Sequence, residues 1–161
     1  MQRFTPPISQ AQMSQIVLPT HTNNHGTVFG GQIAAWCDIC ASISARRFSQ
    51  KPVVTASMDQ LHFLQPVQQG MIVVFRSQVN ATWRTSMEVG VRVDAEDPES
   101  GKSVHCCTAY LTFVALTAEG NPTPIPQLET GEDVEWVRRA TQANERREVR
   151  LQMRSHRRGR S

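Results

Sequence analysis

Residues 23 to 38 bring together side chains that could activate a carbonyl group and move a proton. Asp38 is the only acidic residue between positions 20 and 45, in a stretch that is otherwise nearly uncharged. A carboxyl group on an apolar helix pays a desolvation cost unless a neighbour hydrogen-bonds it or it spends time neutral, which suits acid/base catalysis. The competing interpretation is structural, with Asp38 capping a backbone group or pairing with an arginine.

Two pairs of residues upstream of Asp38 could assist it. Gly30 and Gly31 would place backbone N–H groups, free of side chains, at the positive end of a helix, where they could stabilise an oxyanion. Asn23 and Asn24 carry amides that could orient water or a carbonyl group. Each pair also has an ordinary explanation, because glycines permit a tight loop-to-helix junction and asparagines are common in turns.

A long helix is needed to position these groups. From Gly30 onward, apolar residues recur at spacings of three and four for about five turns, which predicts a helix with a core-facing stripe. The opposite face carries Asp38 among glycine, alanine and serine residues. We therefore expect a helix that is buried on both sides and that lets a ligand or another backbone approach closely. The predicted core stripe consists of Ile33, Trp36, Cys37, Cys40, Ile43 and Phe48.

Five strands are predicted around this helix, one before it and four after it. Residues 87 to 94 alternate between apolar and polar, as expected for an antiparallel strand with one buried face. The last run is apolar on both faces, which predicts an interior position in the sheet. This order defines an α+β fold whose sheet has an outer face and an edge to protect, so we expect a second copy of the chain to pair with it. The predicted strands are residues 14–19, 53–64, 71–82, 85–96 and 103–116.

The end of the chain differs in composition from the rest. We expect a main domain over 8–120, followed over 121–161 by a proline-rich extended exit, a charged and exposed helix from about residue 132, and a basic tail. The formal net charge is +3, and the positive excess lies in this tail. Because no aromatic interleaving or known module accompanies it, nucleic-acid binding is not expected.

Composition sets the broad class of protein. With 39% hydrophobic and 19% charged residues, the chain has the composition of an ordinary globular domain. We expect no membrane span and a cytoplasmic location, because no apolar stretch is long enough and no signal-peptide pattern is present. The four cysteines lie in apolar segments and are expected to be reduced thiols. Cys37 and Cys40 form a C-x-x-C pattern about two turns into the helix, which does not favour a redox or metal site.

The residues from Asn23 to Asp38, N-N-H-G-T-V-F-G-G-Q-I-A-A-W-C-D, resemble the active-site motif of acyl-CoA thioesterases with the hotdog fold. Later segments are similar to that family in the same order, among them V-T-A-S-M-D-Q-L-H-F-L-Q-P-V-Q-Q-G-M and T-W-R-T-S-M-E-V. The resemblance covers roughly residues 12 to 128. It implies a long central helix wrapped by an antiparallel sheet, with the C-terminal helix as an addition, and hydrolysis of fatty acyl-CoA to free fatty acid and CoA.

The resemblance also implies roles for single residues. Asp38 matches the catalytic acid, Asn23 its catalytic asparagine, and Gly30 the residue whose backbone N–H polarises the thioester carbonyl. His25 departs from the family, which commonly has asparagine there. Gly31 and the segment Arg84, Thr85 and Ser86 match substrate-binding positions, with arginine meeting a CoA phosphate.

The same resemblance implies an assembly and excludes a cofactor. Members of the family commonly form homodimers that assemble as trimers of dimers, with the site shared between subunits. No cofactor or metal is expected, because CoA is itself part of the substrate.

Two alternative functions were weighed. A hotdog-fold enoyl-CoA hydratase or dehydratase is suggested by His62, Phe63 and Pro66, but His62 lies in a strand-like run and the full dehydratase pattern is absent. A non-catalytic acyl-CoA-binding protein could dispense with Asp38, so its presence argues against that alternative.

Overall fold

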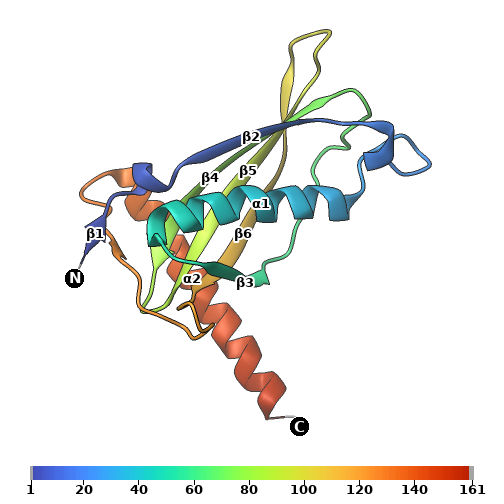
Figure 1. The fold of residues 1–161 in the computed structure, drawn as a ribbon. Coiled ribbons are helices and arrows are strands. Elements are labelled where there is room, and N and C mark those ends of the chain that lie inside the picture. The colour runs from blue at the N-terminus through green and yellow to red at the C-terminus, as the bar shows by residue number, and fades with distance from the viewer. Residues whose placement is uncertain (1, 160–161) are drawn as a thin grey trace.

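A 20-residue helix, α1 (Gly30–Ser49), lies along the inner face of a curved antiparallel sheet (Figure 1). The computed structural model describes residues 2–159. The five strands are arranged in the order β2-β4-β5-β6-β3. Their bounds are β2 (Ala11–Ile16), β3 (Val53–Met58), β4 (Ile72–Thr82), β5 (Ser86–Glu96) and β6 (Ser103–Ala115). The remaining elements are β1 (Arg3–Phe4), the short 3-10 helices η1 (Pro6–Ser9) and η2 (Pro19–His21), β7 (Gln127–Leu128) and α2 (Val134–Arg158).

The core lies between α1 and the inner face of the sheet. Trp36 on α1 packs edge-on against Phe75 of β4, with ring centroids 5.9 Å apart, and Phe48 and Phe113 are almost completely buried. The predicted core stripe of α1 is confirmed, apart from Ile43, which is only partly buried. These contacts fix the rotation of α1 about its axis and thereby determine which way Asp38 faces.

The opposite face of α1 is more open than the sequence analysis predicted. Asp38 is partly buried, whereas Gly31, Ala35 and Ile39 are exposed. The expectation of a helix buried on both sides is therefore wrong for the single chain. Small side chains there leave α1 accessible along the side that faces away from the sheet.

Helix α2 crosses the outer face of the sheet (Figure 1). It begins after Asp133, whose side chain accepts a hydrogen bond from the backbone N–H of Trp136 at 3.0 Å. The prediction of an exposed terminal helix is wrong for the middle of α2, because Ala143 is fully buried and Arg146 reaches the buried Glu88 of β5. Only the last turns, from residue 151 onward, are exposed throughout.

Two strand predictions had the wrong bounds. The first predicted strand, residues 14–19, corresponds to β2, which begins at Ala11 and ends at Ile16. The strand expected over 53–64 corresponds to β3, which ends at Met58. A register shift between Thr55 and Ser57 interrupts the pairing of β3 with β6, and the chain then continues as a loop. The other three strands are close to their predicted ranges, and β6 lies inside the sheet as expected.

The proline-rich exit contacts the rest of the fold. Ile125 is almost completely buried in the main core, and its backbone N–H donates to the carbonyl of Arg84 at 3.1 Å. Further along, β7 pairs in parallel with β1. The exit thus carries the chain from the end of β6 to the outer face of the sheet, where α2 starts.

Candidate active site

Asp38 lies in the third turn of α1, and Thr55 of β3 holds its carboxylate. The Thr55 hydroxyl donates a hydrogen bond to Asp38 Oδ1 at 2.6 Å. This short contact to a charged acceptor fixes the orientation of the carboxylate and leaves its second oxygen available. Thr55 was not identified from the sequence, because a threonine in a β-strand is ordinary.

The start of α1 presents two free backbone donors. Phe29, at the N-cap, supplies no side-chain acceptor, and the described residues provide no hydrogen-bond partner for the N–H groups of Gly30 and Gly31. The Phe63 ring lies over this turn, and a Cβ atom on Gly30 would be 3.1 Å from it. Such a turn can stabilise a developing negative charge through its N–H groups and the helix dipole.

Asn23 holds the loop before α1 in shape. Its Oδ1 accepts from the backbone N–H of His25 at 2.9 Å, and its Nδ2 donates to the Thr27 hydroxyl at 2.9 Å. The turn role considered for this residue is thus confirmed. An amide nitrogen carries two hydrogens, so one N–H of Asn23 remains for a further partner.

A single chain does not bring these three groups to one point. Gly30 and Asp38 are eight residues apart on the same helix, which is about 12 Å of axial rise at 1.5 Å per residue. A reacting carbonyl needs an oxyanion donor within about 3 Å and a base that reaches it directly or through one water molecule. Gly30 and Asp38 of one chain therefore cannot act on the same carbonyl.

The predicted CoA-binding segment lies far from the start of α1. Arg84 and Thr85 lie in the turn between β4 and β5, and Ser86 begins β5; the backbone N–H of Trp83 donates to the carbonyl of Ser86 at 2.8 Å. The Thr85 carbonyl accepts a hydrogen bond from the backbone N–H of Ala115, and Ala115 pairs with Val53 at the start of β3, just after α1. This turn therefore lies at the end of the sheet near the C-terminus of α1. Arg84 is exposed and could bind an anion there.

The four cysteines and His62 are the residues on which the alternative predictions depended. All four cysteines are free and buried, which confirms the reduced thiols. Burial raises the pKa of the Cys40 thiol, the opposite of what an activated thiol needs. His62 is exposed in the loop after β3, not in a strand as expected. Among the described residues, no group of three His, Cys, Asp or Glu side chains could hold a metal ion.

No helix in the described part of the chain is long and apolar enough to cross a membrane.

Comparison with known proteins agrees with this fold and site. Residues 25–102 match the thioesterase superfamily. The chain is 43% identical over 134 residues to the uncharacterized acyl-CoA thioester hydrolase YkhA of Bacillus subtilis. The aligned residues cover 81% of this chain and 78% of that protein. The chain therefore belongs to the acyl-CoA thioester hydrolases of the thioesterase superfamily.

Solved structures extend the likeness to the whole fold. The crystal structure of an apo-hexameric acyl-CoA thioesterase has a TM-score of 0.90 and 34% identity, covering 95% of this chain and 97% of that one. The acyl-CoA hydrolase of Staphylococcus aureus, solved in complex with butyryl coenzyme A and coenzyme A, has a TM-score of 0.86 and 35% identity, covering 96% and 95%. The hotdog fold is thereby confirmed.

Alanine variants of the Staphylococcus aureus enzyme provide a comparison of spacing. Crystal structures exist of three variants, in which an asparagine, an aspartate or a threonine is replaced. The aspartate lies fifteen positions after the asparagine and seventeen before the threonine. Asn23, Asp38 and Thr55 have the same spacing in this chain.

Proposed function

We propose that this protein hydrolyses fatty acyl-CoA to a free fatty acid and CoA, at a site built by two subunits. The observation that carries the proposal is the carboxylate of Asp38, oriented by the 2.6 Å hydrogen bond from Thr55 and left open on the accessible face of α1. Its partners at the start of α1 lie about 12 Å away along the same helix. A second copy that places its own Asn23 and Gly30 beside Asp38 would complete the site.

The surface around Asp38 supports such pairing. Ile39, one position further along α1, is 51% exposed, and Val54 on β3 is 46% exposed. Within the described chain, β3 pairs only with β6, so its other edge can accept a strand. Exposed apolar side chains beside an open sheet edge are the usual signs of an interface between subunits. The known hexameric relative supports a trimer of dimers here.

The chemistry follows from the groups that would then meet. The thioester carbonyl accepts a hydrogen bond from Gly30 N–H of one subunit, which stabilises the negative charge that develops on its oxygen. Asp38 of the other subunit takes a proton from water as the water oxygen attacks the carbonyl carbon. The C–S bond then breaks, and the CoA thiolate leaves and is protonated. The free N–H of Asn23 would position the water or the carbonyl group.

Direct attack by Asp38 is the alternative route and would pass through an acyl anhydride that water then hydrolyses.

Further properties follow from this proposal. Gly31 would add a second backbone donor beside Gly30, and Arg84, with Thr85 and Ser86, would bind the CoA phosphates as a charged hydrogen-bond donor. The chemistry needs only side chains and backbone, so we propose that no cofactor is required and that EDTA-treated enzyme keeps its activity. A cytoplasmic location stays a prediction.

Release of CoA from a panel of acyl-CoA substrates tests the activity, and mixed subunits test the site. Asp38→Asn should keep the fold and lower turnover by about two orders of magnitude or more, which is the scale of a general-base contribution. Asn23→Ala should lower kcat more than it raises KM. When the two variant chains are refolded together, each mixed dimer contains one site with both residues intact, so part of the activity should return.

Two results would contradict the proposal in different ways. Near-normal turnover of Asp38→Asn would remove this residue from the mechanism. Mixed dimers that are shown to form, yet are no more active than either parent, would place the whole site within one chain. Crotonyl-CoA serves as the control substrate, because hydration without release of CoA would favour the hydratase alternative.

A further inference from the structure

The loop that follows β3 carries an aromatic ring to the start of α1 (Figure 1). A Cβ atom added to Gly30 would lie 3.1 Å and 3.3 Å from two carbon atoms of the Phe63 ring, so one edge of this ring touches the first turn of the helix. A Cβ atom added to Gly31 would meet no described atom within 4 Å. Phe63 thus covers the Gly30 side of the turn and leaves the Gly31 side open.

Backbone hydrogen bonds hold this loop against its neighbours. The N–H of Leu64, the residue after Phe63, donates to the carbonyl of Cys106 in β6 at 2.9 Å. Further along the loop, the Val67 carbonyl accepts from the N–H of Val28, just before α1, at 2.8 Å. A ring fixed in this way has its position before any substrate binds, as a preorganised site requires.

Packing within the single chain does not account for Phe63. Its ring is 46% exposed, and Phe29, the N-cap residue of α1, is 52% exposed. Neither aromatic residue belongs to the main core of the described chain. Large apolar side chains left exposed beside a functional group indicate a surface that a ligand or a partner covers. Part of the Phe63 ring is therefore available to a substrate whose carbonyl binds at Gly30.

We propose that Phe63 is a positioning residue for thioester hydrolysis, which excludes water from the Gly30 N–H and supports the thioester group that this N–H polarises. The inference rests on the proposed hydrolysis of fatty acyl-CoA. Within the described chain no group accepts a hydrogen bond from the Gly30 N–H, so without a cover bulk water would compete with the thioester oxygen.

The expected benefit of the ring is electrostatic. A backbone donor stabilises an oxyanion more strongly where water is excluded and the local dielectric constant is low. The water molecule that reacts is held by Asp38 of the other subunit, so a cover over Gly30 does not remove it. A ring that only filled space would instead contribute to stability and leave kcat unchanged.

Release of CoA by purified full-length variants tests the proposal, with the acyl-CoA on which the unmodified protein is most active. Phe63→Ala should lower kcat about tenfold, which is less than the 10²–10³-fold cost of losing an oxyanion donor itself. The KM and the inhibition constant of CoA should each change by less than about threefold, because the loss falls mainly on the transition state. Phe63→Leu keeps an apolar cover and should recover most of kcat. Urea unfolding of each variant checks that the fold persists.

Gly30→Ala tests the same contact from the other side. It keeps the backbone N–H, but its Cβ atom would press on the Phe63 ring at 3.1 Å and force the ring to move. We expect Gly30→Ala to lower kcat about fivefold or more in the unmodified protein and much less in the Phe63→Ala background, because residues in contact are coupled in a double-mutant cycle. Gly31→Ala, whose Cβ atom meets open space, should show no coupling to Phe63→Ala.

Leu64→Ala is the matched control, since Leu64 is the next residue of the loop, is 61% exposed and should leave kcat unchanged on replacement. Three results would overturn the inference: an unchanged kcat for Phe63→Ala, an equal loss for Leu64→Ala, or independent effects of Gly30→Ala and Phe63→Ala. Failure of the unmodified protein to release CoA from any acyl-CoA would refute the proposed function, and this inference with it. The two kinds of failure are therefore distinguishable.

Discussion

Among the described residues, Arg146 holds the one carboxylate that is completely enclosed beneath α2, and its removal gives a sharp test of how this helix is attached. Glu88 is 0% exposed and receives Arg146 Nη2 at 2.6 Å and Nε at 3.1 Å. Arg150 reaches the same carboxylate at 3.3 Å, and Asn80 Nδ2 donates to it at 3.3 Å. Arg146→Met keeps much of the apolar length of the side chain and deletes the charge.

The expected loss follows from the charge that remains. Breaking a buried ion pair by removing one partner costs about 3–5 kcal/mol, because the other charge stays desolvated. Arg150 is retained as a second cation, which places Arg146→Met at the lower end, near about 3 kcal/mol. The added change Glu88→Gln removes the unpaired charge and should restore about half of that loss or more.

Urea unfolding followed by circular dichroism, at one protein concentration for all variants, measures these differences. A loss of about 3 kcal/mol corresponds to a midpoint shift of roughly 1–2 M urea for a domain of this size. Arg147→Met is the matched control and should cost about 1 kcal/mol or less. The guanidinium carbon of Arg147 lies 4.7 Å from the ring centroid of Trp83, and within the described structure no buried carboxylate pairs with this arginine. A cost below about 1 kcal/mol for Arg146→Met, or no recovery on adding Glu88→Gln, would refute the account.

Three other substitutions test separate parts of the structure. Thr55→Val should lower kcat at least tenfold with little change in KM or in the free energy of unfolding, whereas Thr55→Ser should recover most of the loss. An equal kcat for both variants would show that Thr55 does not position Asp38. Burial alone would raise the pKa of Asp94, but hydrogen bonds with Arg92 and His105 outweigh it and lower that pKa. The Asp94 charge therefore contributes to the free energy of unfolding above the unfolded pKa of about 3.9, and this contribution is lost as pH falls through the lower folded pKa. Asp94→Asn should be less stable at pH 7, and the difference should shrink in acid. Gly90→Ala should cost about 1–3 kcal/mol in urea unfolding, because its Cβ would displace Asn80 from 2.6 Å; an unchanged midpoint would show that the outer face has spare room.

The periodic parts of the fold could be predicted from the sequence, and the parts set by long-range contacts could not. The apolar stripe of α1 and the alternation along β5 each record a face turned toward one core, so both elements were located correctly. Asp38 was proposed as a site residue for the same reason, as a charge that breaks an apolar pattern. Thr55 carries no such signal, because its role depends on β3 passing beside α1, a contact between residues seventeen positions apart.

Helix α2 was predicted as a helix, but its packing on the sheet was not, because its buried side is charged. Apolar periodicity detects a helix face only when it packs on apolar surface, and the outer face of β5 presents Glu88, Gly90 and Asp94 instead. A polar sheet face can be covered by a polar helix face when each enclosed charge is matched. The residues of α2 that are turned toward the sheet recur at spacings of four, three and four, which places them on one side of the helix. They are Arg139, Ala143, Arg146 and Arg150, and none of them is exposed.

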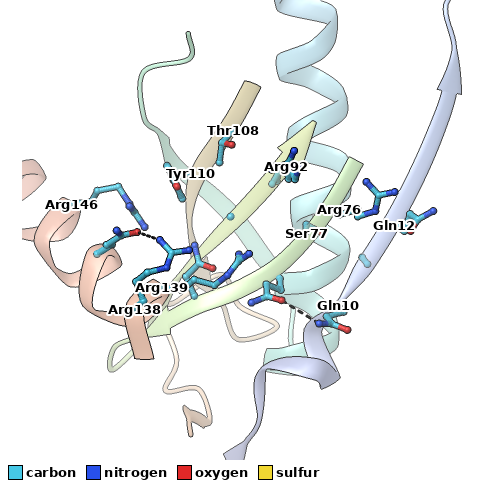
Figure 2. Close-up of a pocket in the computed structure, with 16 residues that line it drawn as sticks. Gln10, Gln12, Arg76, Ser77, Arg92, Thr108, Tyr110, Arg138, Arg139 and Arg146 are labelled. Atoms are coloured by element: carbon cyan, nitrogen blue, oxygen red, sulfur yellow. Dashed lines mark hydrogen bonds between the residues drawn. The ribbon is translucent and has the colours of Figure 1, made fainter. Parts of the chain in front are cut away.

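That stripe of arginines also explains why a cavity of about 590 Å³ remains between the first half of α2 and the outer face of the sheet (Figure 2). Arg146 and Arg150 pair with the buried carboxylate of Glu88 and the partly buried carboxylate of Asp59, and these contacts hold the middle of α2 on the sheet. Toward the start of α2, Arg139 is bonded to Glu135 of its own helix, so it gives no contact that would close α2 over Gly90. The helix is therefore attached by ion pairs near its middle, while the space beneath its first half stays lined by cations. A variant with both Arg146 and Arg150 replaced by methionine should lose the docking of α2 on the sheet, whereas Arg138→Gln, which removes an arginine paired only within α2, should leave the helix in place. Proteolysis at exposed sites in α2 measures this docking, and equal cleavage of both variants would show that the ion pairs to Glu88 and Asp59 do not attach the helix.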